Sequence, residues 1–305
     1  MTALRKTSRL QLNLILLAVT LAWGLSWPAN KVGLAYIPPL WFAALRLVIG
    51  TIAMFVLVFC LKKLSLPSRK DLPIIFVMGI FQIGLFLIFM NIGLDVQSAG
   101  HAAVLVYTTP LWIMPIAIFV FGEPNTRRRW TGLALGCIGV AIMLSPWEID
   151  WTNPQVLIGT TFLMGASFSL SISILCARHM TWYSEPLALV PWQLLVGTLI
   201  VLPIALILHP HPTLQWTMSA TISMTYTSVI ASALGFWGMA VVSKELPSSI
   251  ASIGFLGVPV SGIVFSVLFF HESVGLLMLL AITLIVTGIL YIISATDETR
   301  YSAKP

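Results

Sequence analysis

Charged side chains are scarce in this chain. Lysine, arginine, aspartate and glutamate make up 9% of its 305 residues, whereas hydrophobic residues make up 58%. A soluble domain carries about 25% charged residues, so this composition excludes an ordinary soluble globular protein. Apolar runs of roughly 18 residues or more recur along the chain, which predicts a polytopic helical membrane protein. The loops between the runs are too short to hold a soluble domain.

Cysteine and the usual catalytic groupings are also scarce. Cys60, Cys137 and Cys176 lie in apolar segments or at their ends, and their spacing gives neither a disulfide framework nor a metal site. Paired acids, a metal cluster, or a nucleophile with its base at membrane depth are missing from the sequence, so we expect no enzyme activity. No cofactor and no metal are expected.

Carboxylates are missing from the middle of every apolar run. Proton-driven antiporters commonly need a titrating carboxylate inside the membrane. The histidines at 101, 209, 211 and 271 lie near the ends of runs, and no phosphate-binding loop indicates direct use of ATP. The sequence therefore favours facilitated diffusion or exchange, with a proton-coupled drug efflux antiporter as the alternative.

Hydropathy and chain breakers predict ten membrane-spanning helices. Each is long enough to cross about 30 Å of hydrocarbon at about 1.5 Å per residue, although the fifth is short. The predicted ranges are 12–34, 39–61, 72–93, 99–121, 130–145, 156–177, 186–208, 216–242, 249–270 and 275–294.

The two halves of the chain resemble each other. The segment PLWIMPIAIFVFGE runs from Pro110 to Glu123, and PVSGIVFSVLFFHE runs from Pro259 to Glu272, 149 positions later. Further pairs lie at similar spacings: Gly139/Gly288, Lys31/Arg178, Tyr36/Tyr183, Pro39/Pro186, Arg46/Gln193, Gly50/Gly197 and Thr51/Thr198. We therefore predict an all-α membrane protein of two five-helix repeats, residues 12–145 and 156–296. Because each repeat has an odd number of spans, the second must insert inverted, as in many transporters.

The positive charges predict the orientation. The net charge of +6 comes from loop lysines and arginines and is not a nucleic-acid signature. With ten spans, the basic residues before the first helix, after the even-numbered helices and in the tail all fall on one side, whereas Lys31 falls on the other. The positive-inside rule then places both termini in the cytoplasm.

Several of these features resemble a known family. The chain resembles the drug/metabolite transporter superfamily in its sequence pattern. The pattern consists of Trp23-Gly24 in the first helix, Arg46 in the second, and a proline-initiated helix ending in glutamate in each half. Within that superfamily, the chain most resembles the EamA-type permeases of bacteria, over about residues 12 to 296. The resemblance implies passage of small metabolites, often export of amino acids or related compounds, through a central cavity. The second half departs from the pattern, because Gln193 replaces the arginine and helix 156–177 has no Trp-Gly.

Arg46 is the sharpest single signal for a transport site. It lies eight residues into its helix, in FAALRLVIGT, without an acidic neighbour in that segment. A cation near mid-membrane costs about 2.5–3.5 kcal/mol on insertion scales, so it normally faces a cavity or a partner. Arg46 is interpreted as a carboxylate-binding group, or else as a structural arginine that reaches the interface or helix-end carbonyls.

Aromatic and polar side chains predict an amphipathic cavity. Aromatic faces can hold apolar or cationic groups, or can simply pack against neighbours and lipid. The cavity candidates besides Arg46 are Trp23, Trp27, Gln82, Tyr107, Thr108, Trp112, Ser167, Trp192, Gln193 and Trp237.

Prolines within the predicted spans are candidate hinges or static bends, because each removes a backbone hydrogen bond. They are Pro28, Pro110, Pro115, Pro191 and Pro259. Glu123 and Glu272 are expected to be structural, capping or tethering helix ends.

The leading hypothesis is therefore a carrier in the bacterial inner (plasma) membrane that exports small metabolites by alternating access. Its expected partners are a small-molecule substrate and the lipid bilayer, and it acts as a monomer or a homodimer without nucleic acid. A non-transporting receptor or accessory subunit is the other alternative, although it would not require kinks and polar residues matched between two inverted halves.

The topology can be tested by cysteine labelling in a background without native cysteines. We expect Asn153→Cys to react with an impermeant thiol reagent from outside intact cells, and Thr126→Cys to be protected. The reverse pattern would exclude cytoplasmic termini.

Overall fold

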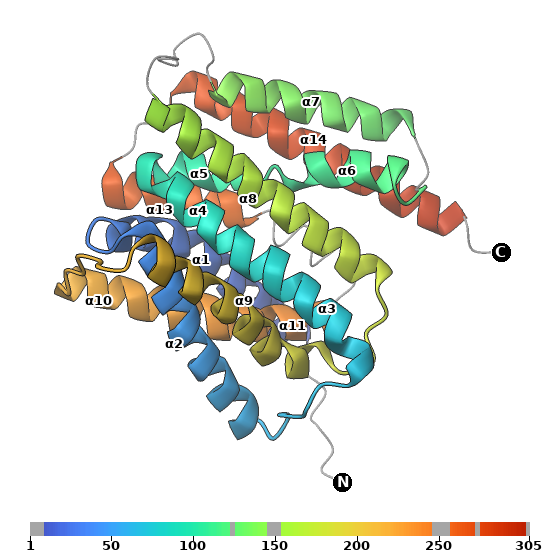
Figure 1. Ribbon diagram of the computed structural model, residues 1–305. Coiled ribbons are helices and arrows are strands. Elements are labelled where there is room, and N and C mark those ends of the chain that lie inside the picture. Colours follow the sequence, from blue (N-terminus) through green and yellow to red (C-terminus); the bar gives the residue numbers. More distant parts are fainter. Residues whose placement is uncertain (1–8, 123–125, 145–153, 246–256, 272–274, 303–305) are drawn as a thin grey trace.

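The computed structural model describes residues 9–122, 126–144, 154–245, 257–271 and 275–302, and every regular element in these ranges is a helix (Figure 1). The first half contains α1 (Arg9–Leu34), α2 (Pro39–Cys60), η1 (Arg69–Asp71), α3 (Leu72–Val77), η2 (Met78–Leu85), α4 (Phe86–Val96), α5 (Ala99–Val106), α6 (Thr109–Phe119) and α7 (Arg127–Leu144). The second half contains α8 (Pro154–His179), α9 (Pro186–Leu208), α10 (Met218–Thr225), η3 (Tyr226–Leu234), α11 (Gly235–Glu245), α13 (Gly257–Phe270) and α14 (Leu276–Ser302). Each predicted range thus contains helix.

The helices begin where the local sequence favours a start. α2 and α9 open on Pro39 and Pro186, whose missing N–H costs nothing at a helix start. Ser98 Oγ accepts a hydrogen bond from the N–H of His101 at the start of α5, and Thr217 Oγ1 accepts one from Ala220 at the start of α10.

Within the described ranges, six helical stretches are long and apolar enough to cross a membrane: 10–34, 39–60, 69–96, 99–119, 154–177 and 186–208. The same ranges hold three shorter apolar helices, Trp130–Ile142, Gly257–Phe270 and Leu279–Gly288. The chain is therefore a multi-pass helical protein, whereas the count of ten spans and the inversion of the second repeat stay predictions.

The fourth predicted helix, 99–121, is broken, although the sequence predicted one span with Pro110 and Pro115 inside it. α5 ends at Val106 and α6 begins at Thr109, with Tyr107 and Thr108 between them. Proline 110 has no N–H to offer the carbonyl of Val106, and the hydroxyl of Thr109 bonds that carbonyl instead at 2.8 Å. Side chains thus satisfy the backbone at the break, which is the condition for irregular backbone at membrane depth.

Two π-helical segments were not predicted. η2 interrupts the third predicted helix and η3 interrupts the eighth, at positions about 149 residues apart. Such segments are rare and occur frequently at functional sites. The two segments pack against corresponding glycines. A Cβ on Gly50 of α2 would lie 3.1 Å from the carbonyl oxygen of Ser228 in η3. Gly197 of α9 lies in the same way against Ile83 of η2.

The packing elsewhere is also matched between the halves. α1 packs against α13 and against α10, η3 and α11, while α8 packs against α5 and α6 and against η2 and α4. α2 and α9 pack against each other and run in opposite directions (Figure 1). Trp41 near the start of α2 bonds the carbonyl of His209 after α9, and Trp192 near the start of α9 bonds that of Ser65 after α2.

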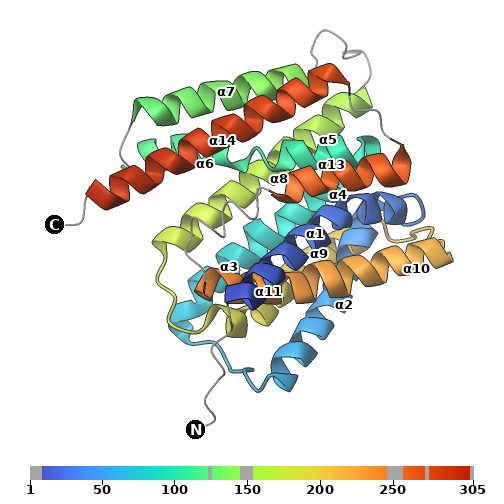
Figure 2. The same ribbon diagram turned by 180° about the vertical axis from the view of Figure 1, so that it is seen from behind.

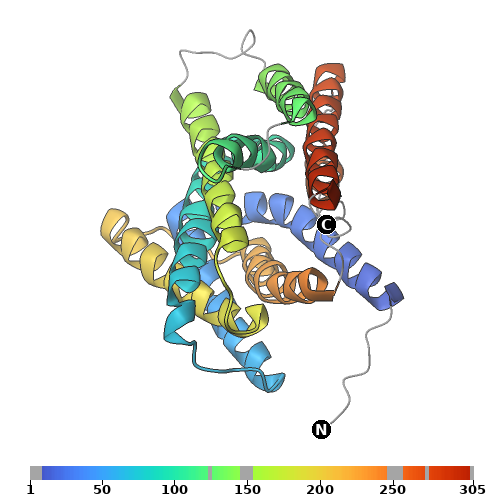
Figure 3. The ribbon, with the colours of Figure 1, turned by 90° about the vertical axis from the view of Figure 1, so that its right-hand side faces the viewer.

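α7 and α14 form a separate pair at one side of the bundle (Figures 2 and 3). Their close approach depends on glycine, because a Cβ on Gly288 would lie 2.5 Å from the carbonyl oxygen of Gly132 and 2.7 Å from the amide of Gly136. Small residues at helix contacts are the usual means of close packing in membranes.

Gly288→Val should therefore destabilise the protein by about 1–3 kcal/mol, because the new side chain overlaps backbone that cannot turn away. Unfolding in detergent micelles measures the change. The control is Leu290→Val on the same helix, where the side chain is exposed and we expect a change within about 0.5 kcal/mol. Equal effects of the two substitutions would contradict the close α7–α14 contact.

Candidate functional site

Arg46 is buried at the meeting point of three elements. Its side chain is 7% exposed on α2. Nε donates a hydrogen bond of 3.1 Å to Ser232 Oγ on η3, and Nη1 donates one of 3.0 Å to Asn30 Oδ1 on α1. We call Arg46, Asn30 and Ser232 the Arg46 cluster.

The partners of Arg46 are themselves held in place. The amide nitrogen of Asn30 donates to the carbonyl of Ser26, one turn earlier in α1. Ser232 Oγ donates to the carbonyl of Thr227 at 2.9 Å, so its lone pairs are left for the guanidinium. Both acceptors of Arg46 are therefore fixed toward the charge.

Among the described residues, no carboxylate forms an ion pair with Arg46. Lys63 and Glu185 do form an ion pair, but they lie in loops at one end of the bundle. A guanidinium remains protonated in proteins. The Arg46 cluster is thus a buried positive charge held by neutral acceptors.

The α2–α9 contact carries a second polar level. Thr51 and Thr198, which occupy corresponding positions in the two repeats, hydrogen-bond through their side-chain oxygens at 2.9 Å. Gln193, which corresponds to Arg46, is 5% exposed, and its Nε2 has no hydrogen-bond partner among the described residues. The halves therefore meet on equivalent residues, but one carries a charge where the other carries an amide.

A third polar cluster surrounds the break between α5 and α6. Thr108 Oγ1 lies 3.2 Å from Ser167 Oγ of α8 and donates to the carbonyl of Leu105. Ser171 of α8 bonds the carbonyl of Thr109 at 3.1 Å. The structure thus brings together Thr108 and Ser167, two of the predicted cavity residues.

Trp27 and Tyr107 are also brought together. Their rings meet edge to face with centroids 6.3 Å apart, and Trp27 is only 3% exposed. Trp23 donates from Nε1 to the carbonyl of Ala231 at 2.9 Å and packs edge to face on Phe236. These two tryptophans of α1 therefore contact the broken helix and the π-helical segment η3, respectively.

Other predicted cavity residues lie elsewhere. Trp112 packs on Phe168, which is 42% exposed. Trp192 lies against Phe55 and the Ser65 loop at one end of the bundle.

Two further candidates are placed by burial. Trp237 is partly buried against the main core. Gln82 is on η2, and its Oε1 is buried without a hydrogen-bond partner among the described residues.

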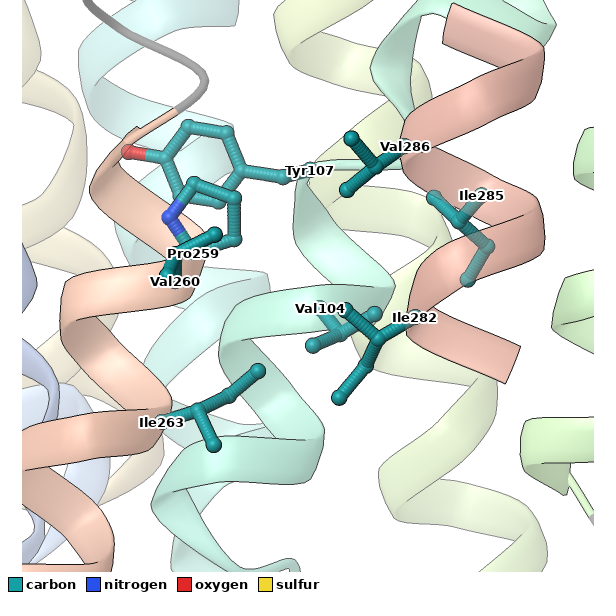
Figure 4. Close-up of a pocket in the computed structure, with 8 residues that line it drawn as sticks. All are labelled: Val104, Tyr107, Pro259, Val260, Ile263, Ile282, Ile285 and Val286. Atoms are coloured by element: carbon teal, nitrogen blue, oxygen red, sulfur yellow. The ribbon is translucent and has the colours of Figure 1, made fainter. Parts of the chain in front are cut away.

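An apolar hollow lies between α5, α13 and α14 (Figure 4). The hollow is shallow, with room for about one water molecule, and the surface that lines it is wholly apolar. The lining residues are Val104, Tyr107, Pro259, Val260, Ile263, Ile282, Ile285 and Val286. Tyr107 faces both this hollow and Trp27, so it connects the hollow to the first helix.

The prolines differ in what they do. Pro110 lies at the start of α6 and marks a real interruption, and Pro259 lies near the start of α13. Pro28, Pro115 and Pro191 lie inside helices that remain continuous. Glu123 and Glu272 lie outside the described residues.

Sequence reasoning did not find Asn30 and Ser232, the two partners of Arg46. Asn30 is a polar residue in an apolar helix and lies one turn after Ser26, a signal that could have selected it. Lys31, next to it, bonds the carbonyls of Leu94 and Asp95 at the end of α4, as expected for a lysine at a helix end.

The apolar helices, the matched halves and a buried charge between them define a multi-pass membrane protein with an internal polar site. The profile of the EamA-like transporter family matches the chain over residues 11–145 and again over 157–294. The chain belongs to the EamA-like transporter family, and the resemblance seen in its motifs is confirmed. It is a membrane transporter, which is consistent with the expected absence of enzyme activity.

Individual relatives agree. The chain is 26% identical over 274 residues to the uncharacterized transporter YoaV of Bacillus subtilis, covering 90% of this chain and 94% of that protein. It is also 26% identical over 285 residues to a probable amino-acid metabolite efflux pump of Escherichia coli, covering 90% and 91%. A solved crystal structure with 18% identity superposes with a TM-score of 0.67 over 94% of this chain and 99% of that one, which shows a common fold.

The Arg46 cluster predicts that removing the side-chain amide of Asn30 costs more stability than removing that of Gln97. Asn30→Leu should destabilise the protein by about 1.5–3 kcal/mol, because a hydrogen bond to a charged group is lost. Gln97→Leu, which removes neutral hydrogen bonds to Val156 and Thr160, should cost about 0.5–1.5 kcal/mol. Thermal unfolding in detergent measures both, and a smaller cost at Asn30 than at Gln97 would contradict the role of Asn30 in holding Arg46.

Proposed function

We propose that this transporter exports small amphipathic carboxylates, amino acids or related metabolites, and that Arg46 binds the carboxylate. The observation that carries the proposal is a buried guanidinium whose described partners, Asn30 and Ser232, are both neutral. Burying a charge without a counter-charge is costly, and a bound carboxylate would offset that cost.

The chemistry of the group fits this role. Guanidinium binds carboxylate through two parallel hydrogen bonds, and such charge-assisted bonds are about twice as strong as neutral ones. An amide oxygen and a hydroxyl are weaker acceptors than a carboxylate, so a substrate can compete with Asn30 and Ser232 for the N–H groups of Arg46.

The surroundings fit an apolar substrate body. Trp27 and Tyr107 present aromatic edges and faces, and the hollow beside Tyr107 is apolar. The name of the Escherichia coli relative, a probable amino-acid metabolite efflux pump, supports the same substrate class.

The mechanism that we propose is alternating access through a central cavity between two inverted five-helix repeats. It is supported by the double family match, by the equivalent π-helical segments, and by the Thr51–Thr198 contact between corresponding residues. Loop charges support cytoplasmic termini, and bacterial relatives support the inner membrane as its location. No buried acidic side chain contacts Arg46 in the described ranges, which supports downhill transport or exchange over proton coupling.

Proteoliposomes loaded with radiolabelled L-amino acids test this function. We expect efflux of amino acids above that of protein-free liposomes, and no such excess for the corresponding amino-acid amides, which lack the carboxylate. Equal efflux of acids and amides would contradict carboxylate recognition, and the absence of any excess would contradict the substrate class.

Variants of the Arg46 cluster separate charge from structure. Arg46→Ala should lower efflux roughly tenfold or more, since charge-assisted hydrogen bonds contribute about 1.5–3 kcal/mol. Asn30→Asp is isosteric and cancels the charge, so it should lower efflux comparably while stability is kept. Arg46→Lys should retain part of the activity, because charge remains but the planar fork is lost. A folded Arg46→Ala protein with wild-type efflux would leave Arg46 a purely structural residue.

A further inference from the structure

Gln193 is a buried polar residue that does not belong to the Arg46 cluster. It is 5% exposed, and its Nε2 hydrogen-bonds to no described residue. Buried polar side chains are nearly always hydrogen-bonded, and an exception requires an explanation. A site for a ligand is one such explanation.

The position of Gln193 follows from the α2–α9 contact. The two helices are antiparallel and cross at Thr51 and Thr198. Arg46 and Gln193 each precede their threonine by five residues, so they lie on opposite sides of the crossing. At about 1.5 Å per residue, they are about 15 Å apart along the helix axes.

The two positions have the same construction. Arg46 on α2 faces the π-helical segment η3, where Ser232 accepts its hydrogen bond. Gln193 on α9 lies beside η2, because a Cβ on Gly79 would lie 2.9 Å from the backbone carbonyl oxygen of Gln193. η2 also carries Gln82, whose buried Oε1 has no partner among the described residues. Arg46 is cationic and Gln193 is neutral, but each lies where a π-helical segment packs against α2 or α9.

We propose that Gln193 is a second substrate site, which binds the carboxylate through its amide N–H groups at the cytoplasmic level, as Arg46 does at the external level. This inference rests on the proposed function and on the predicted orientation, in which α2 enters from outside and α9 from the cytoplasm. A substrate carboxylate thus meets a neutral donor first and a cation second. The difference sets the concentration needed at each face and does not drive net transport.

Everted and right-side-out membrane vesicles test the second site separately at each face. The probe is a mixture of radiolabelled L-amino acids, and the readout is the half-saturating concentration. Gln193→Leu should raise it about tenfold in everted vesicles, where the cytoplasmic face is outward, since one buried hydrogen bond is lost. In right-side-out vesicles the change should stay below about twofold.

A second variant, Gln193→Arg, keeps the test conclusive if the Gln193→Leu protein misfolds. It places in the second repeat the residue that the first repeat has, so it should lower the half-saturating concentration in everted vesicles. A gain of affinity cannot come from misfolding. Thr198→Val, on the same helix at the crossing, is the control and should change neither face selectively.

The outcomes distinguish this inference from the proposed function. Should Gln193→Leu affect both faces alike, or neither, while Arg46→Ala still lowers transport, the second site is wrong and carboxylate binding at Arg46 stands. Should Arg46→Ala transport as the wild type does, the proposed function itself fails. An increase confined to right-side-out vesicles would contradict the placement of Gln193 at the cytoplasmic level.

Discussion

Hydrocarbon offers no hydrogen bonds, and the interior of this transporter is built around that constraint. At the α5–α6 break and at both π-helical segments of the described chain, a side chain bonds a backbone carbonyl. Thr109 satisfies the carbonyl freed at the α5–α6 break, Trp23 bonds a carbonyl of η3, and Ser169 bonds a carbonyl of η2 at 2.7 Å. Arg46 is the extreme case, because a full charge is held by two neutral acceptors. Under the proposed function, the same groups would also bind a polar substrate, because they lie inside the protein, where lipid does not reach.

The matched halves explain where these polar groups occur. The π-helical segments η2 and η3 lie at corresponding positions, and each packs against a glycine of the opposite repeat, Gly197 or Gly50. The described helix contacts of the two halves therefore correspond, and Arg46 and Gln193 show that the side chains at corresponding positions can differ in charge.

The sequence predicted the helices well because hydropathy and prolines act locally. Arg46, Thr108 and Ser167 stand out in the sequence because they are polar residues in apolar runs, and the structure gives each of them polar contacts inside the bundle. Sequence reasoning failed where the answer depends on a contact across the bundle. Asn30 and Ser232 are ordinary polar residues until the packing of α1 and η3 places them beside Arg46. The π-helical segments contain no proline. Each packs against a glycine of the other half, Gly50 or Gly197, which lies more than a hundred residues away in the sequence, so no local pattern could predict them. For Trp112 and Trp192, depth along the helix likewise does not say which face of the helix carries the ring, so their neighbours Phe168 and Phe55 could not be predicted.

The α2–α9 pair is tied along its whole length, and this limits which parts can move. Trp41 and His209 join one end, Thr51 and Thr198 the middle, and Ser65 and Trp192 the other end. Loops add equivalent ties: the carbonyl of Tyr36 accepts from the N–H of Gln215, while Asp71 accepts from the N–H of Tyr183 and the hydroxyl of Ser184. Under the proposed alternating access, α2 and α9 therefore act as a fixed unit. We expect the contacts that exchange to be those of α1 with α13 and of α8 with α5 and α6. At the first of these, Gly24 and Ser261 keep the side chains small where α1 meets α13.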